Sequence, residues 1–207
     1  MLSPTYPIET ARLVIRPFVK GDLDALHDLH GRPDVARFLY WEPRSLDRVR
    51  EVLDKRITES RLQAEGDALS LAVVRRDTGV LVGELVLFWL SDKHRLGEIG
   101  YVFHPDHGGQ GFATEAARVC LRLGFEGLGL HRVVGRLDAR NTRSARVLER
   151  LGMRREAHFV QNEFVKGEWA DEAVYAMLES EWWATTARDT TRVSAGNGAA
   201  VSGEPTP

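Results

Sequence analysis

Residues 104–124 read HPDHGGQGFATEAARVCLRLG, a glycine-rich turn that runs directly into a helix. The helix is indicated by small and apolar residues at relative positions 0, 3, 4, 7, 8 and 11, which share one buried face: Ala113, Ala116, Ala117, Cys120, Leu121 and Gly124. Gly108, Gly109 and Gly111 permit positive φ and close approach of backbone N–H groups to an anion. An isolated turn of this composition is usually only a tight turn. Because a strand candidate ends at Phe103 and a regular helix follows, we expect a phosphate-binding loop.

Apolar runs on both sides of this loop predict the rest of the fold. β-branched and aromatic residues predict strands at residues 12–16, 69–75, 80–90, 97–103, 132–137, 155–165 and 173–178. Helical spacing predicts helices over residues 22–29, 45–57 and 141–151. An antiparallel meander therefore leads into a strand, loop, helix, strand and helix, and a final hairpin closes the sheet. The expected fold class is α/β with a mixed, mostly antiparallel sheet.

Composition favours one soluble domain. The chain has 207 residues with 28 Lys and Arg against 30 Asp and Glu, so no global charge favours nucleic acid. We expect no membrane span and no signal peptide, and hence a cytoplasmic protein. The lone Cys120 excludes an intrachain disulfide and is expected in the core, and the seven histidines show no metal-ligand spacing. Residues 1–183 are expected to form the domain, and residues 184–207, poor in large apolar side chains, a disordered tail.

Two common phosphate loops do not fit. No Gly-Lys-Ser/Thr follows the glycines, which excludes a nucleoside-triphosphate loop. Asp138 ends the next strand candidate, where a dinucleotide fold carries its ribose-binding acid. However, the third glycine of that pattern is missing, and too little chain follows for a doubly wound sheet.

Five motifs in order resemble the GNAT N-acetyltransferases, specifically their RimJ/RimL branch. They are TARLVIRP at 10–17, IGYVFHP at 99–105, GQGFATEA at 109–116, NTRSARVLERLGM at 141–153 and WADEAVYAM at 169–177. The resemblance spans about residues 8–179 and implies acetyl-coenzyme A as cosubstrate, with no metal. The family usually has Gln or Arg where this chain has Gly108, which implies either a looser hold on the pyrophosphate or one that relies more on backbone donors.

The resemblance also implies a set of cofactor-binding residues. In such a fold, the strand ending at Phe103 diverges from the strand at 132–137, and the pantetheine arm lies between them. The implied cofactor-binding residues are Tyr101, Val102, Phe103, Gly108, Gly109, Gln110, Gly111, Phe112, Ala113, Thr114, Asn141, Ser144 and Arg146. Asn141 is also a natural helix N-cap, and both roles are compatible.

Two residues are candidate catalysts. Ser144, one helical turn beyond Asn141, is expected to donate a hydrogen bond to the departing sulfur, although a small packed residue suits that position equally well. Glu98 is expected to accept the proton of the attacking amine, with a solvated strand carboxylate as the even alternative. Trp41, Phe88, Trp89 and Tyr101 are expected to line the acceptor cleft, although strand aromatics more often lie in the core.

The expected activity is direct transfer of an acetyl group to a primary amine, without an acyl-enzyme, because no Ser or Cys is paired with an obvious base. The acceptor is a small molecule or a peptide N-terminus; the weak base favours an α-amine slightly, since its reference pKa is about 7.7–8.0 against about 10.4 for lysine. A homodimer is compatible with the sequence. The alternative from another class is a module that binds an acyl-coenzyme A as a sensor without turnover.

Overall fold

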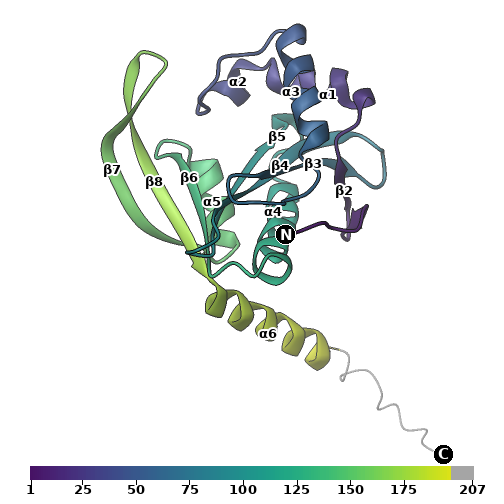
Figure 1. Cartoon of the computed structure of the whole chain (residues 1–207), viewed down its shortest axis with the longest axis vertical. Helices are drawn as coiled ribbons and strands as arrows, with labels where there is room; N and C mark the ends of the chain where they lie inside the picture. The colour runs from purple at the N-terminus through teal and green to yellow at the C-terminus, as the bar shows by residue number, and fades with distance from the viewer. Residues whose placement is uncertain (197–207) are drawn as a thin grey trace, which may run out of the picture.

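The computed structural model describes residues 1–196, which form an eight-stranded sheet with helices on both faces (Figure 1). The strand order is β1-β2-β3-β4-β5-β6-β8-β7, and only the β5–β6 pair is parallel. The strands are β1 (Ile8–Glu9), β2 (Leu13–Pro17), β3 (Ala68–Arg75), β4 (Leu81–Ser91), β5 (Leu96–Phe103), β6 (Arg132–Asp138), β7 (Arg154–Val165) and β8 (Glu168–Leu178). The predicted mixed, mostly antiparallel sheet is confirmed.

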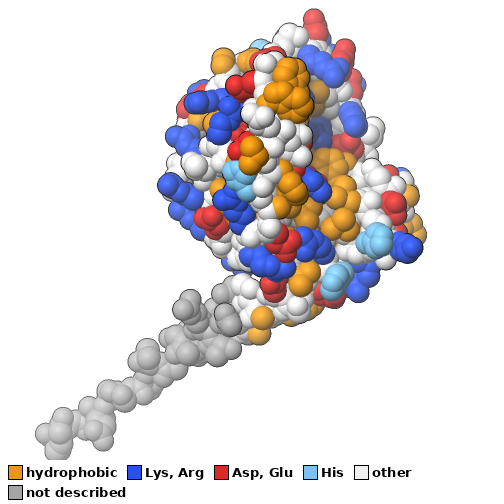
Figure 2. All heavy atoms as spheres, turned by 90° about the vertical axis from the view of Figure 1, so that its left-hand side faces the viewer, with side chains coloured by type: hydrophobic (Ala, Val, Ile, Leu, Met, Phe, Trp, Pro, Cys, Tyr) orange, Lys and Arg blue, Asp and Glu red, His pale blue; other side chains and the backbone are white. Residues whose placement is uncertain are grey.

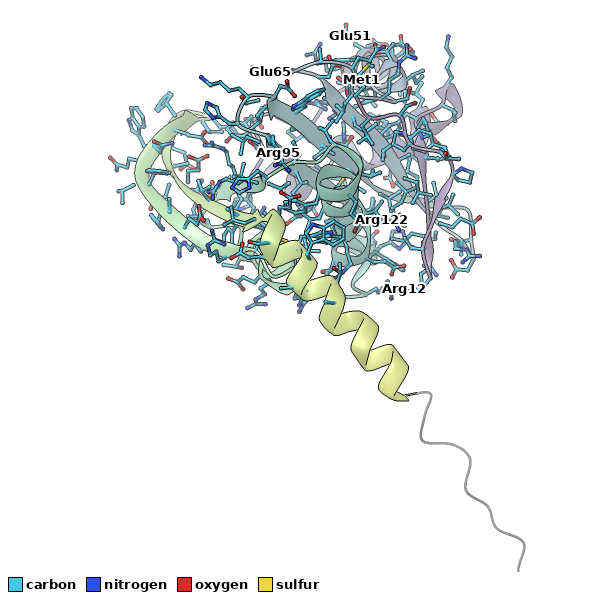
Figure 3. All side chains as sticks on the ribbon, turned by 60° about the horizontal axis from the view of Figure 1, so that its bottom comes forward. Met1, Arg12, Glu51, Glu65, Arg95 and Arg122 are labelled. Atoms are coloured by element: carbon cyan, nitrogen blue, oxygen red, sulfur yellow. The ribbon has the colours of Figure 1, made fainter. Side chains whose placement is uncertain are left out.

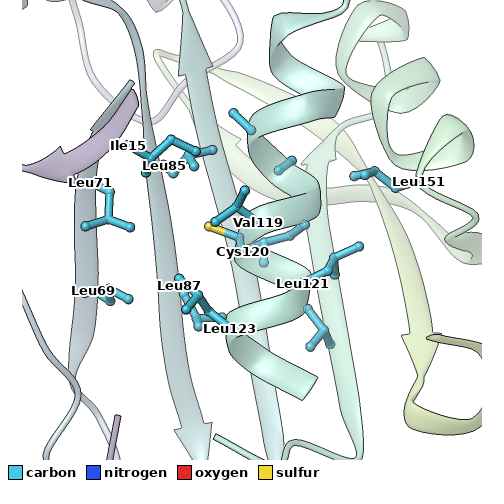
Figure 4. Close-up of a cluster of buried hydrophobic side chains, with 14 of the residues drawn as sticks. Ile15, Leu69, Leu71, Leu85, Leu87, Val119, Cys120, Leu121, Leu123 and Leu151 are labelled. Carbon is cyan, nitrogen blue, oxygen red and sulfur yellow. The ribbon is translucent and has the colours of Figure 1, made fainter. Parts of the chain in front are cut away.

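Helices cover both faces of the sheet, and the last helix extends away from it (Figure 1). They are α1 (Leu23–His30), α2 (Pro33–Ala36), α3 (Leu46–Thr58), α4 (Phe112–Arg122), α5 (Thr142–Arg150) and α6 (Glu179–Gly196), with short helices at Lys20–Asp22, Pro105–His107 and Leu123–Gly127. A smaller core joins α1 and α3 to one face of β3 through Leu26, Val49 and Ala72. The larger core joins α4 and α5 to the other face, where strand leucines such as Leu71 and Leu87 meet Cys120 and Leu121 (Figure 4).

The pattern of α4 explains why the helix packs so tightly on the sheet. Ala116, Ala117, Cys120 and Leu121 are buried as predicted, whereas Ala113 is half-buried and Phe112 and Val119 complete the buried face. Small side chains let the helix approach the strands closely. Burial in this apolar core raises the pKa of the Cys120 thiol to about 12, so the thiol stays protonated and unreactive.

The parallel pair β5–β6 is short. Its paired residues run only from Leu96 to Glu98 on β5 and from Arg132 to Val134 on β6. Beyond Glu98, β5 keeps its pairing to β4 as far as Phe103, while β6 stays paired to β8. The sheet therefore opens between β5 and β6, and the backbone edges that face this gap meet no other strand in the described part of the chain.

The β7–β8 hairpin is longer than predicted, because β8 begins at Glu168 and not at Ala173. The hairpin arches away from the rest of the sheet (Figure 1), and nearly every residue of β7 is exposed or half-exposed. The alternation of apolar and polar residues that reveals a half-buried strand is consequently absent there. Its exposed apolar side chains are Phe159, Val160, Phe164 and Trp169. The side of the molecule that carries the hairpin in Figure 1 faces the viewer in Figure 2, where hydrophobic side chains lie among basic and acidic ones.

Helix α6 continues to Gly196 and so includes the first part of the segment expected to be a disordered tail from residue 184 onward. The helix is anchored at its start: Trp182 is 2% exposed and stacks on Phe125, with ring centroids 5.7 Å apart. The indole N–H of Trp182 also donates to Glu126 at 2.9 Å. Thr is a poor helix former, so the helix depends on a tertiary anchor of this kind, which composition alone does not reveal. The remainder of the expected tail, residues 197–207, lies outside the described residues.

Candidate active site

The glycine loop between β5 and α4 has the backbone conformation expected of it. Gly109 and Gly111 have φ of 76° and 81°, a region that disfavours side chains, and Gly111 is the N-cap of α4. Gly108 differs from its sequence-based assignment: its φ is −67°, and its N–H donates to the Pro105 carbonyl at 2.8 Å. The Gly108 N–H is therefore already satisfied within the turn, and the free donors begin one residue later.

Six consecutive backbone N–H groups, from Gly109 to Thr114, make no hydrogen bond within the described part of the chain. The next one, at Glu115, donates to the Gly111 carbonyl at 3.0 Å, as α4 begins. The Thr114 hydroxyl oxygen is also buried without a partner. Free N–H groups at a helix N-terminus carry partial positive charge and bind phosphate oxygens. The loop thus fits a pyrophosphate, including the predicted residues Gln110 and Ala113 through their backbone.

Asn141 and Ser144 lie across the β5–β6 gap from Tyr101. The Asn141 side chain accepts a hydrogen bond from the Ser144 N–H at 3.1 Å, so it is the N-cap of α5. The Ser144 hydroxyl donates to the Tyr101 phenol oxygen at 2.9 Å, and the phenol donates to the Ser144 carbonyl, also at 2.9 Å. The two side chains therefore bridge β5 and α5. Burial raises the pKa of the Tyr101 phenol, which stays protonated at neutral pH.

The alternation of side chains along β5 decides which of the predicted residues face α4 and α5. Tyr101 and Phe103 pack against the larger core under α4 and α5, as Ile99 does. Glu98 and Val102 point to the opposite face, because neighbouring residues in a strand alternate. Tyr101 therefore does not lie in the same cleft as Phe88, contrary to its predicted role in lining the acceptor site.

Trp89 is also misassigned by the sequence analysis. It is 8% exposed and belongs to the larger core with Leu87 and Ile99, on the face covered by α4. Phe88, the residue before it, is half-buried on the other face, directly opposite Glu98 in the β4–β5 register. The general tendency of strand aromatics to enter the core thus applies to Trp89 and not to Phe88.

Trp41 lies at the edge of the α1–α3 side. Its ring contacts His30 with centroids 4.9 Å apart, and the Arg44 guanidinium stacks over it at 4.1 Å. His30 in turn is fully buried and bonded to Glu84 at 2.9 Å. This cluster fixes the loop between α2 and α3, of which Trp41 is part.

A row of charged groups crosses the sheet beside Glu98. The Arg136 guanidinium lies 3.4 Å from Glu98 and 3.5 Å from Glu172, and Glu172 accepts a further bond from Asn162 at 2.9 Å. Burial raises the pKa of Glu98, and the charge of Arg136 opposes that rise. Glu98 is thus a partly buried carboxylate whose basicity exceeds that of a free side chain.

The loop before α3 and the β7–β8 hairpin contact each other beside these charged groups. Tyr40, in the loop before α3, donates to Glu163 of β7 at 2.7 Å, and Lys166 at the hairpin tip donates to the Ala36 carbonyl at 2.7 Å. Glu163 and Glu172 act electrostatically on both Tyr40 and Glu98, which places the three carboxylates in one neighbourhood. The hairpin and the loop therefore enclose the Glu98 face from the side.

Sequence reasoning missed Arg136, Glu172 and Tyr40 as parts of this site. Arg136 and Glu172 carry no motif, and only the register of β6 against β5 and β8 brings them beside Glu98. Tyr40 stands next to Trp41 in an apolar run, which offers a signal for a loop that lines a pocket. Arg146, predicted to contact phosphate, makes no ion pair within residues 1–196 and lies exposed on α5.

Within the described residues, no group of three or more His, Cys, Asp or Glu side chains is arranged to hold a metal ion. No helix in that part of the chain has the length and apolar composition needed to cross a bilayer.

Comparison with known proteins identifies the family. Residues 12–154 match the model of the acetyltransferase (GNAT) domain. An uncharacterized N-acetyltransferase of Bacillus subtilis, YnaD, is 33% identical over 176 residues, which cover 84% of this chain and 98% of that protein. The spermidine N(1)-acetyltransferase of Vibrio cholerae is 26% identical over 173 residues, covering 83% and 96% of the two chains.

A solved structure agrees with this match. The crystal structure of a GNAT-family acetyltransferase from Bacillus anthracis superposes with a TM-score of 0.75 at 33% identity, over 84% of this chain and 99% of that one. The open β5–β6 pair, the loop of free N–H groups and these similarities agree: the chain belongs to the GNAT family of N-acetyltransferases.

Proposed function

We propose that this enzyme transfers the acetyl group of acetyl-coenzyme A directly to the primary amine of a small, positively charged molecule. The observation that carries the proposal is the arrangement of two half-sites on either side of one gap in the sheet. The unpaired N–H groups of Gly109 to Thr114 lie at one end of the gap, and Glu98 lies on the acceptor face.

On the cofactor side, the backbone of residues 109–114 would hold the pyrophosphate, and Arg146 would add a positive charge beside it. Asn141 and the open edges of β5, at Val102 and Phe103, would bind the pantetheine amides. When bound, acetyl-coenzyme A supplies an activated thioester. Backbone N–H groups near Val102 would stabilise the negative charge that develops on its carbonyl oxygen.

On the acceptor side, Glu98 would accept the proton released by the attacking amine. A carboxylate with a raised pKa is a better base than a free one, and the charge of Arg136 opposes that rise. Ser144 and Tyr101 would donate a hydrogen bond to the departing thiolate, whose reference pKa of about 8.5 makes full proton transfer unnecessary. Nitrogen–carbon bond formation and carbon–sulfur cleavage then leave the acetylated amine and the free thiol.

Two observations favour a small amine over a protein N-terminus. The contacts of Tyr40 with Glu163 and of Lys166 with Ala36 enclose the acceptor face, which leaves little room for an extended chain. Three carboxylates, Glu98, Glu163 and Glu172, lie there, and the Arg136 guanidinium lies close to Glu98 and Glu172, so the face suits a positively charged substrate. The similarity to a spermidine N(1)-acetyltransferase supports the same class. We also infer membership of the RimJ/RimL branch from the five motifs.

The test is release of coenzyme A from acetyl-coenzyme A in the presence of polyamines, monoamines, aminoglycosides and peptides with free N-termini. We expect turnover well above the amine-free rate with di- and polyamines, and weak turnover with peptides. Efficient turnover with peptides would instead establish an N-terminal acetyltransferase. Tight binding of acetyl-coenzyme A without turnover on any amine would establish the sensor.

A further inference from the structure

The glycine loop is held from outside by one arginine far away in the sequence. Arg12, just before β2, donates from Nη1 to the Gln110 carbonyl at 2.8 Å. Its Nε and Nη2 atoms hold the Glu115 carboxylate at 2.7 and 2.6 Å. Its guanidinium also lies 4.8 Å from the centre of the Phe112 ring. One side chain thus contacts the loop, the first residue of α4 and the first turn of that helix.

Glu115 is in turn fixed by more than this ion pair. The Arg12 backbone N–H donates to it at 3.0 Å, and the Thr10 hydroxyl at 2.7 Å. Burial acts to raise the pKa of Glu115, but these hydrogen bonds outweigh it and lower the pKa, so the carboxylate is ionised at neutral pH. The planar guanidinium has donors for two acceptors at once, a geometry that lysine does not have.

The geometry points to a role for this pair in cofactor binding. We propose that Arg12 and Glu115 are positioning residues that hold residues 110–112 in the conformation in which the N–H groups of the loop converge on the pyrophosphate. The proposal rests on the cofactor site described under the proposed function. Its physical basis is preorganisation: a loop that is already ordered loses less conformational entropy when the ligand binds.

Arg12 and Glu115 act on the peptide unit between Gln110 and Gly111, whose conformation sets the direction of the loop N–H groups. Gly111 has a φ of 81°, and a Cβ added there would lie 3.4 Å from Arg12 Nη2. The Gly111 backbone therefore packs directly beneath the guanidinium. If Arg12 is removed, the Gln110 carbonyl loses its partner, and the peptide unit between Gln110 and Gly111 becomes free to rotate.

The chain offers a closely matched control. Arg95 has the same side-chain exposure as Arg12, 50%, and likewise bonds one carbonyl, of Gly129 at 2.6 Å, and one carboxylate, of Glu179 at 2.8 Å. The two arginines lie at separate positions in Figure 3, and Arg95 makes no recorded contact with the glycine loop. Arg95→Gln therefore removes an equivalent set of contacts elsewhere on the domain.

The experiment measures coenzyme A binding by calorimetry and amide hydrogen exchange of residues 108–118 in the free protein. Arg12→Gln is expected to weaken binding about tenfold, the effect of freeing about one backbone residue, and to speed exchange in this segment. Glu115→Gln is expected to do the same, and the double variant to lose no more than either single variant. Arg95→Gln is expected to alter neither measurement.

Arg12→Lys tests whether the positive charge at this position is sufficient or whether the hydrogen bonds to both Gln110 and Glu115 are required. A lysine keeps the positive charge but does not bond Gln110 and Glu115 together, so we expect its affinity to stay close to that of Arg12→Gln. Full affinity in Arg12→Lys, or unchanged exchange in Arg12→Gln, would overturn the proposal. Failure of the cofactor site looks different, because the wild-type protein would then not bind coenzyme A and Gly111→Val would change nothing. Failure of the proposed function on the acceptor side would appear only in the turnover assay and would leave coenzyme A binding intact.

Discussion

Ser144 and Tyr101 exchange hydrogen bonds across the opening between β5 and α5: the serine hydroxyl donates to the phenol, and the phenol donates to the serine carbonyl, both at 2.9 Å. The pair joins the strand that borders the gap to the helix that covers it. Its hydroxyl protons are already ordered by these bonds, so only a small rotation is needed to redirect one of them to a sulfur atom in the gap.

Ser144→Ala is expected to lower kcat while leaving the affinity for acetyl-coenzyme A nearly intact, because a bond to the leaving sulfur strengthens only as charge develops there. The loss should reach at most about a hundredfold, the low end of general acid catalysis. Tyr101→Phe should have a similar effect, and the double variant should lose little more. Steady-state kinetics checks this, and a kcat equal to that of the wild type in Ser144→Ala would leave Ser144 a packing role only.

Glu98→Gln is expected to lower kcat/KM most strongly below the pKa of the acceptor amine, where a proton must be removed. At higher pH the amine arrives neutral, so the defect should shrink. The pH–rate profile of the variant against the wild type is the measurement. A loss of equal size at every pH would assign Glu98 to substrate orientation and not to proton transfer.

Arg136→Gln is expected to move the acid limb of the kcat/KM profile to higher pH. The Arg136 charge opposes the rise that burial causes in the pKa of Glu98, so its removal raises that pKa further. A base is active only when deprotonated. Activity of the variant should therefore fall below that of the wild type at pH values between the pKa of Glu98 in the wild type and its higher pKa in the variant, and recover above both. The double variant with Glu98→Gln should show no such shift, and an unmoved limb in Arg136→Gln would contradict the pairing.

Gly111→Val is expected to weaken coenzyme A binding while the fold survives, because its φ of 81° is unfavourable for a β-branched residue. Gly66→Val is the matched control: its φ is 93°, and an added Cβ would meet nothing within 4 Å. Both variants should lose stability by about 1–2 kcal/mol, but only Gly111→Val should lose affinity. Calorimetric titration and thermal melts compare them, and equal affinities in the two folded variants would refute the loop assignment.

Trp182→Ala is expected to lower the free energy of unfolding by about 3–5 kcal/mol, the usual cost of truncating a buried large aromatic residue.

A chain that ends after Ala187 keeps Trp182, its contact with Phe125 and its bond to Glu126. We expect its melting temperature and turnover to match those of the full chain. A clear loss on truncation would show that residues beyond 187 contribute to the domain.

The sequence predicts those parts of the molecule whose patterns are local. Helices α3 and α4 and the strands from Leu69 to Phe103 follow from the spacing of apolar residues, which depends on near neighbours. The start of β8 at Glu168 escaped prediction because its first residues do not alternate in the usual sense: Trp169 is an exposed aromatic residue and Glu172 a buried carboxylate.

The site residues likewise fall into those whose contacts are local in the sequence and those whose contacts are distant. The glycine loop and Asn141 are recognisable because each forms its contacts within a few residues. Arg136, by contrast, reaches Glu98 across a strand pair, and Arg12 reaches Glu115 over 103 positions. Trp89 and Phe88 are adjacent and chemically alike, and only the tertiary fold decides which of them enters the core.

The three-residue pairing of β5 with β6 has a consequence for how the protein survives in a cell. A ligand that fills the gap binds only the native state, so it stabilises that state by mass action, by about 2.7 kcal/mol at a hundredfold excess over Kd. The folded fraction, and with it resistance to proteases, then rises with the supply of acetyl-coenzyme A. Under the proposed function, we therefore expect an enzyme built on a split sheet to be longer-lived when its acetyl donor is abundant.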